Sequence, residues 1–376
     1  MNNHALTLKA NREDISRRSF IKSGIAVSGM LGLSSFFMSK ALAAEKNFLP
    51  EESSPSGNMP CFDIHAHYVP AAYRQVLSEH GQAHAEADGL PIPEWSFDEH
   101  LAMMDRLNIA TAMLSIAAPH FHFGDSPAAA RLARKVNEEG AMLVSHSPNR
   151  FGLLASLPLP DVDNSLEELE YAFDILHADG IKLPTNSLGV YLGDTRLDPI
   201  FAELSRRKAV VVLHPVKPSS VPSNVLDGCP IPVVEYLIDT TRTVTNLILN
   251  GTLQRYPDIK LVIPHAGAFL PSLTDRLDGL KKILKPKTGV LPDVRESLHQ
   301  IYYDLAGFPV PLQLQALLQM TDPDHLLFGS DWPYAFEALC VNQKQQLLTT
   351  GLLTAELQRA IFHDNALALF PRLKQV

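Results

Sequence analysis

CFDIHAH, the run Cys61–His67, has the pattern of a β-strand that ends in two metal-binding side chains. Side chains at positions i and i+2 of a strand share one face, so His65 and His67 are expected to lie together. Three later runs also place a histidine or an aspartate after apolar residues, namely VVVLHP (210–215), LVIPHAG (261–267) and LLFGSDWP (326–333). Four such runs predict parallel strands whose carboxyl ends meet at one rim, where (β/α)8 enzymes hold their chemistry.

The rest of the sequence supplies the remaining elements of such a barrel, because strand-like and helix-like patterns alternate along it. The strand candidates are 61–67, 109–117, 151–157, 180–184, 209–214, 259–265, 301–305 and 325–330. The helix candidates are 97–107, 127–147, 163–178, 197–207, 232–255, 268–284, 311–320 and 352–370. Eight of each predict an α/β fold, a single (β/α)8 TIM barrel over residues 60–376. Long segments rich in Pro, Gly and Ser follow several strands and are predicted to be loops that shape the substrate site, namely 68–96, 118–126, 185–195 and 215–231.

The residues before the barrel have the pattern of an export signal. SRRSFIK (16–22) is typical of the twin-arginine pathway, and ALA (41–43) offers a cleavage site of the small-x-small type. The apolar stretch between them is interrupted by Gly and Ser, whereas a membrane span needs about 20 apolar residues. We therefore predict a signal peptide over 1–43, a linker over 44–59, a periplasmic protein and no stable membrane anchor.

Composition excludes two other kinds of site. The chain has 32 Lys and Arg against 41 Asp and Glu, with no basic stripe, so nucleic acid is not an expected partner. Its three cysteines, Cys61, Cys229 and Cys340, are too few and too scattered for a disulfide framework or a zinc–thiolate centre. We interpret them as structural residues.

The strand-end residues have the composition of a catalytic metal centre. Three imidazoles and one carboxylate (His65, His67, His214 and Asp331) suit Zn²⁺ best, with Mn²⁺ or Fe²⁺ as alternatives. Four ligands leave room for a water or a substrate oxygen. Each residue alone has a simpler interpretation, since a His-x-His pair occurs in many cores and Asp331 suits the N-cap of a following helix. The aligned set favours the metal.

Several motifs resemble the amidohydrolase superfamily, namely HAH (65–67), HP (214–215), HAG (265–267) and GSD (329–331). The closest resemblance is to the branch that contains aminocarboxymuconate semialdehyde decarboxylase, over roughly residues 60–372. It implies one divalent ion held by the four ligands above, with His265 as the catalytic base or acid. Either Asp331, close to the metal, or His265 is expected to deliver the proton in the reaction. In binuclear relatives a modified lysine after the fourth strand bridges two ions, and Lys182 lies inside that strand, but the resemblance is to a branch that holds one ion.

The resemblance also implies a reaction and a substrate class. IPEWS (92–96), HFGD (122–125) and YLGD (191–194) are similar to 6-methylsalicylate decarboxylase-like proteins, which implies decarboxylation of a small hydroxylated aromatic acid. The semialdehyde decarboxylase carries an arginine before its second strand, but residues 98–105 contain none, which argues against a dicarboxylate substrate. A hydrolase of a lactone or amide that uses an activated water remains the alternative.

Four residues are predicted to contact the substrate: His122, Arg242, Arg276 and Trp332. In the family, the position that Arg276 occupies can reach the substrate of a neighbouring subunit, so a homodimer is expected. Both arginines lie in predicted helices, where an ion pair on the surface is the simpler interpretation.

Overall fold

The computed structural model describes residues 60–80, 88–283 and 292–375. These residues lie in one of two compact units, Ser54–Val376, and the other unit, Met1–Ser53, has no described residue. The predicted signal peptide (1–43) and linker (44–59) therefore lie outside the described residues. Among the residues that are described, no helix combines the length and the apolar character needed to cross a bilayer.

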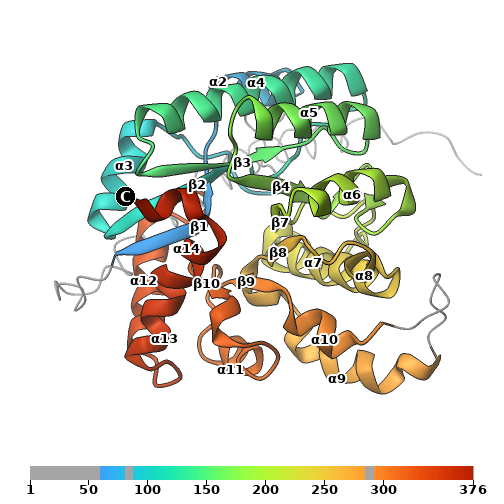
Figure 1. The fold of residues 1–376 in the computed structure, drawn as a ribbon, viewed down its shortest axis with the longest axis vertical. Coiled ribbons are helices and arrows are strands. Elements are labelled where there is room, and N and C mark those ends of the chain that lie inside the picture. The colour runs from blue at the N-terminus through green and yellow to red at the C-terminus, as the bar shows by residue number, and fades with distance from the viewer. Residues whose placement is uncertain (1–59, 81–87, 284–291, 376) are drawn as a thin grey trace, which may run out of the picture. The chain divides into compact units, whose positions relative to one another are not determined.

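Within the described residues, eight strands form one sheet in the order β1-β2-β3-β4-β7-β8-β9-β10, and every neighbouring pair is parallel (Figure 1). Their bounds are β1 (Cys61–His67), β2 (Ile109–Ser115), β3 (Phe151–Ser156), β4 (Gly180–Pro184), β7 (Val210–His214), β8 (Lys260–Ile263), β9 (Tyr302–Asp304) and β10 (Leu326–Leu327). The chain after β10 returns to β1, where Ile64 N–H donates to Phe328 O at 3.0 Å and Asp331 N–H donates to His65 O at 2.8 Å. The predicted (β/α)8 barrel is confirmed.

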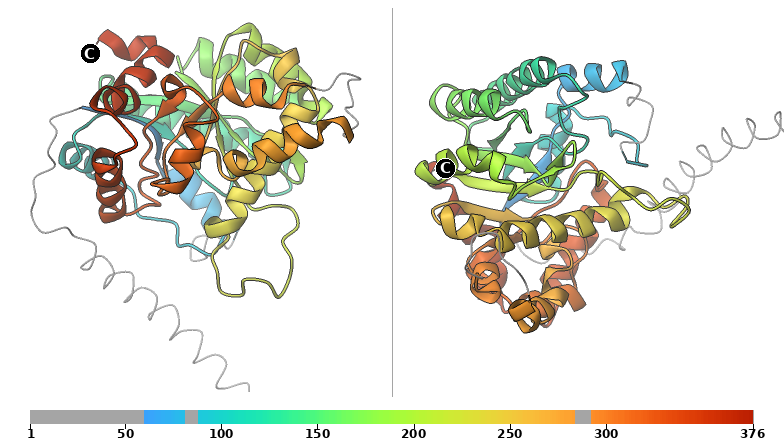
Figure 2. Two further views of the ribbon diagram at one scale, coloured as in Figure 1. Left: turned by 90° about the horizontal axis from the view of Figure 1, so that it is seen from below. Right: turned by 90° about the vertical axis from the view of Figure 1, so that its right-hand side faces the viewer.

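Helices surround the sheet in the two perpendicular views of Figure 2. They are α2 (Ala71–Glu79), α3 (Phe97–Arg106), α4 (Ser126–His146), α5 (Val162–Asp174), α6 (Asp198–Arg206), α7 (Ile231–Leu249), α8 (Thr252–Arg255), α9 (Leu270–Leu280), α10 (Val294–His299), α11 (Leu312–Leu317), α12 (Glu337–Thr349), α13 (Ala355–Arg359) and α14 (Asn365–Leu369). Side-chain caps define several starts. Ser96 accepts from Glu99 N–H before α3, and Asp125 accepts from Ala128 N–H before α4.

An apolar cluster occupies the barrel interior beneath the rim. Val210, Val212 and His214 are spaced two residues apart along β7, so their side chains share one face of the strand. The two valines belong to a buried cluster with Phe62, Ile64, Met113, Leu154, Val262 and Leu327. Phe370, directly after α14, stacks on Phe62 at 5.7 Å between ring centroids and joins the same cluster. This apolar filling supports the polar residues at the strand ends.

Some helix predictions were incomplete. The predicted helix 232–255 is two helices, because Gly251 between them adopts φ 68°. The predicted helix 352–370 contains a π-helical turn over Ala360–Asp364. Segments predicted as loops contain α2 and a hairpin of β5 (Asn186–Ser187) and β6 (Val190–Tyr191). No helix was predicted over the residues that form α12.

Candidate metal centre

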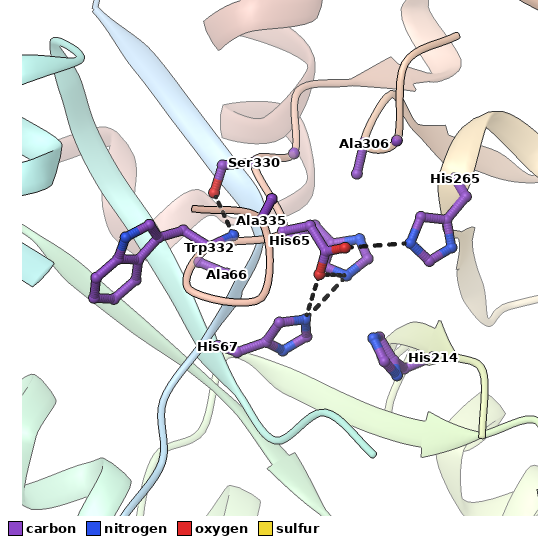
Figure 3. A network of polar contacts seen from close by, with 12 residues as sticks. His65, Ala66, His67, His214, His265, Ala306, Ser330, Trp332 and Ala335 are labelled. Atoms are coloured by element: carbon purple, nitrogen blue, oxygen red, sulfur yellow. Dashed lines mark hydrogen bonds and ion pairs between the residues drawn. The ribbon is translucent and has the colours of Figure 1, made fainter. Parts of the chain in front are cut away.

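The four predicted ligands lie together at the rim (Figure 3). One ligand atom from each of His65, His67, His214 and Asp331 lies within 4.8 Å of the others. The three histidines are buried, and Asp331 is partly exposed. They come from β1, from the end of β7 and from the segment after β10, so the closed sheet brings together residues far apart in the sequence.

A local irregularity in β1 lets neighbouring residues face the barrel interior. Ile64 belongs to the interior apolar cluster, and the next residue, His65, belongs to the ligand group. The pairing of β1 with β2 shifts register between Asp63 and Ala66, which is how a β-bulge redirects a side chain. The shift places His65 and His67 at the mouth, directly above the apolar filling.

Hydrogen bonds fix which nitrogen of two of the imidazoles faces the centre. His214 Nδ1–H donates to the Pro215 carbonyl at 2.8 Å, which leaves the Nε2 lone pair free. His67 Nδ1 lies 3.1 Å from Ser115 Oγ. That hydroxyl donates to Ala66 O at 2.8 Å and accepts from Lys182 Nζ at 2.9 Å, so it accepts from His67 as well. His67 Nε2 therefore also presents a lone pair.

Asp304 orients the third imidazole and is a site residue that the sequence analysis missed. Its Oδ2 accepts from His65 Nδ1 at 2.9 Å, and its Oδ1 accepts from the backbone N–H groups of His265 and Ala306, both at 3.1 Å. Asp304 thus joins a ligand to the segment that carries His265. Asp304 could have been predicted as a site residue from its position near the end of the strand candidate 301–305, because the ends of the strands meet at the same rim.

These donors and acceptors fit a divalent cation. His65 Nε2 and His67 Nε2 lie 3.1 Å apart, and Asp331 Oδ1 lies 3.0 Å from His67 Nε2. The lone pairs of these acceptor atoms face one another, so they require a positive charge between them. Burial alone would lower the pKa of His65, but Asp304 and Asp331 raise it to about 9. The two carboxylates therefore favour a positive charge at this position. Nitrogen and carboxylate oxygen ligands suit Zn²⁺, Mn²⁺ and Fe²⁺.

Asp331 is held as a carboxylate in an unusual backbone conformation. Burial raises its pKa, but His65, His265 and His67 outweigh that effect and hold the pKa well below its usual range.

The backbone φ of Asp331 is 62°, in the left-handed region that a residue with a Cβ rarely adopts. The N–H groups of the residues on either side are bonded: Ser330 N–H donates to Asp63 and Trp332 N–H donates to Ser330 Oγ, both at 3.0 Å.

His265 lies beside the ligands without joining their group. Its Nε2 is 3.6 Å from Asp331 Oδ2, and its ring is partly exposed. It follows β8 in a short turn. This placement agrees with the expectation that His265 stays off the metal, and its catalytic role remains a prediction.

A cavity of about 300 Å³ opens in front of the centre. His214, His265 and Asp331 contribute to its lining. Most of the wall is apolar or aromatic, with Leu90, Ala118, Val233, Tyr236, Phe308 and Tyr334. Among the described residues, no lysine or arginine lines it. Its volume suits one substituted aromatic ring.

Two of the predicted substrate residues lie elsewhere. Trp332 packs on His100 with ring centroids 4.4 Å apart, and Figure 3 shows it turned away from the ligands. Tyr334, two residues later, lines the cavity instead. His122 donates to or accepts from Ser126 Oγ at 3.1 Å and lines a second cavity of about 130 Å³. The predicted contacts of Trp332 and His122 with substrate remain predictions. The positions of the two side chains, outside the cavity in front of the metal centre, do not favour them.

The basic residues considered in the sequence analysis have structural partners or lie outside the cavity. Arg242 donates to Asp239 at 2.9 Å and to the Tyr191 hydroxyl at 3.1 Å. Arg276 is exposed on α9. Lys182 is buried inside the barrel, where burial lowers its pKa to about 7, and its Nζ bonds to Ser115. Lys182 is also absent from the ligand group formed by the described residues.

The amidohydrolase family profile matches residues 62–372. The chain belongs to the amidohydrolase family. This amidohydrolase is 35% identical over 324 residues to 6-methylsalicylic acid decarboxylase from Penicillium expansum, a match that covers 85% of this chain and 98% of the relative. A crystal structure described as an amidohydrolase matches with 37% identity and a TM-score of 0.79, over 83% of this chain and 99% of that one.

A more distant structure supports the same fold. Dihydroxybenzoic acid decarboxylase from Polaromonas sp., with bound manganese and the inhibitor 2-nitroresorcinol, has a TM-score of 0.71 at 22% identity. The match covers 83% of this amidohydrolase and 97% of that chain. At this identity the likeness concerns the barrel itself.

Proposed function

We propose that this amidohydrolase is a metal-dependent decarboxylase of small hydroxylated aromatic acids resembling 6-methylsalicylate. The observation that carries the proposal is the group of three imidazoles and one carboxylate that faces a largely apolar cavity of about 300 Å³, with His265 beside Asp331. The 35% sequence identity to a 6-methylsalicylic acid decarboxylase, in a match that covers 98% of that enzyme, supports the same reaction.

The reaction exchanges a carboxylate for a proton on one ring carbon. The new C–H bond forms at that carbon, the C–C bond to the carboxylate breaks, and its electron pair returns to the ring as CO₂ leaves. A divalent ion at this centre would supply Lewis-acid chemistry that stabilises negative charge on the substrate. His65, His67, His214 and Asp331 would hold that ion.

The proton comes from the residues that face the cavity. Asp331 is held as a carboxylate by its imidazole neighbours, so His265 is the better carrier, with its Nε2 3.6 Å from Asp331 Oδ2. General acid catalysis requires such a group within reach of the reacting carbon. The apolar walls, including Tyr236 and Phe308, hold the ring and exclude water. Loss of bulk water strengthens the electrostatic interactions at the centre.

We propose one ion per chain, either Zn²⁺, which the donor set suits, or Mn²⁺, which the Polaromonas decarboxylase binds. The bond of Lys182 Nζ to Ser115 Oγ supports a single ion, because it engages the lysine that would bridge a second one.

Substrate selection is expected to follow the charge of the cavity. Because no lysine or arginine of the described residues lines it, a second carboxylate on the ring would be buried without a partner. In a panel of 6-methylsalicylate, 2,6-dihydroxybenzoate, an aromatic dicarboxylate and a lactone, we expect CO₂ from the two monocarboxylates. The dicarboxylate should have a kcat/KM lower by roughly tenfold or more, equivalent to at least about 1.4 kcal/mol. Hydrolysis of the lactone without CO₂ release from any acid would favour the hydrolase alternative.

Export to the periplasm by the twin-arginine pathway is proposed from SRRSFIK at 16–22. If it is correct, replacing Arg17 and Arg18 by lysine leaves the uncleaved precursor in the cytoplasm, as cell fractionation measures. Equal periplasmic amounts of the variant and the natural protein would contradict it.

A homodimer in which Arg276 reaches the partner's site is proposed on the family resemblance. The exposed position of Arg276 on α9, with no ion pair to another described residue, is compatible with it. Sedimentation equilibrium of the mature protein distinguishes a dimer from a monomer.

A further inference from the structure

The turn that carries His265 has a strained backbone. Four consecutive residues have positive φ angles: 55° at His265, 52° at Ala266, 77° at Gly267 and 54° at Ala268. Glycine adopts this region freely, but the other three residues carry a Cβ that disfavours it. Such conformations persist only where the surrounding structure enforces them. The contacts around residues 265–268 therefore identify what holds the turn.

Gln313, the second residue of α11, makes the contacts that hold this turn. Its Nε2 lies 3.0 Å from His265 O, 3.2 Å from Ala266 O and 2.6 Å from Ala268 O. The left-handed turn directs these three carbonyls toward one point, and the two N–H groups of a single amide are shared among them. Gln313 also lines the cavity in front of the metal centre.

The direction of the His265 ring depends on this backbone. Its Nδ1 is buried and has no hydrogen-bond partner among the described residues, so no polar contact anchors that edge of the ring. Asp304 takes the backbone N–H of His265, not the ring. The ring packs closely on Gly307, where a Cβ would come within 3.2 Å of His265 Cδ2. A change in the turn would therefore move Nε2 relative to Asp331.

We propose that Gln313 is a positioning residue for the reaction: its amide holds the 265–268 turn and thereby aims His265 Nε2 at Asp331 and at the substrate. The inference rests on the proposed decarboxylase function. Gln313 lies in a different element from every predicted ligand, and it acts through His265 rather than through the metal.

Gln313→Leu tests the proposal, because leucine has a similar volume and no N–H group. We expect kcat to fall roughly 100-fold, since a displacement of about 1 Å has an effect of that size. KM and metal content should stay close to the wild-type values, because the ligands are unchanged and leucine keeps a side chain of similar volume at this point of the cavity wall. Gln315→Leu is the matched control, as Gln315 is exposed on the same helix, and it should retain wild-type kcat.

Gln313→Glu separates positioning from a general loss of stability. A glutamate carboxylate would repel the three carbonyl oxygens, whereas its protonated form donates one hydrogen bond to them. Relative to wild type, kcat of Gln313→Glu should therefore rise as the pH is lowered from about 8 to about 6, because the carbonyl oxygens raise the pKa of the new carboxyl group. The corresponding ratio for Gln313→Leu should stay flat over the same range.

Several outcomes would overturn the proposal. Wild-type kcat in Gln313→Leu, loss of its metal, or equal losses in Gln313→Leu and Gln315→Leu would each do so. If the wild-type enzyme releases no CO₂ from any hydroxybenzoate, the proposed function fails instead. The turn is then tested by the crystal structure of Gln313→Leu: relaxed φ angles at residues 265–268 support the holding role, and unchanged positive values contradict it.

Discussion

His265→Ala is expected to lower kcat by roughly 10²–10⁴-fold, the range for loss of a general acid. Its Nε2 lies 3.6 Å from Asp331 Oδ2 and lines the cavity, so it is the group placed to bring a proton to the ring carbon. The metal should stay bound, because the four atoms that form the ligand group exclude His265. Steady-state CO₂ release and metal analysis of the same sample measure both effects.

His146→Ala is the matched control for this substitution. His146 is exposed at the end of α4, where its ring bonds only to the Met142 carbonyl among the described residues. The control should retain wild-type kcat. Loss of metal from His265→Ala would instead make His265 a ligand, and unchanged kcat would remove it from the proton transfer.

Removal of the divalent ion should abolish decarboxylation, and Mn²⁺ or Zn²⁺ should restore it. Without the ion, the Lewis acid is lost. Burial lowers the pKa of His65, but Asp304 and Asp331 raise it to about 9, so His65 is expected to carry a proton at neutral pH. Metal uptake below that pH must displace this proton. Affinity should therefore fall by about tenfold for each unit that the pH drops below about 9, and level off above it.

Titration of chelated protein with Mn²⁺ at several pH values measures this dependence. Circular dichroism of the chelated protein controls for unfolding, and the inhibition should reverse without refolding. Full activity after complete removal of the ion would contradict the metal-dependent mechanism. An affinity that does not change between about pH 6 and about pH 8 would show that His65 carries no proton to displace.

The barrel and its ligands were predictable because their signals are local. A run such as VVVLHP combines β-branched apolar residues, which suit a buried parallel strand, with a ligand at the strand's carboxyl end. The strand candidate 61–67 has the bounds of β1, and 180–184 has those of β4. Parallel closure then requires the strand ends to meet, so the ligand group followed from topology.

Other parts of the site depend on contacts between distant segments that no local pattern reveals. Asp304 bonds to His65 across 239 positions, and Gln313 bonds to His265 across 48. Helix α12 was not predicted, because its sequence lacks the apolar stripe of an amphipathic helix. Its buried face includes the polar side chains of Gln343 and Lys344. Gln343 donates to the Leu305 and Gly329 carbonyls, which explains its burial.

Trp332 illustrates a different limit. An aromatic residue directly after a ligand was a reasonable candidate for a ring-binding wall. However, the backbone at Asp331 turns through φ 62°, and the Trp332 ring packs on His100 in the core. The direction of a side chain after a left-handed residue follows from the turn, which the sequence does not specify.

Anomalous diffraction from crystals of the manganese-loaded protein shows where the ion binds. We predict one peak per chain, bonded by the Nε2 atoms of His65, His67 and His214 and by the carboxylate of Asp331. A crystal that holds manganese elsewhere and none between these four residues would contradict a metal centre at this rim.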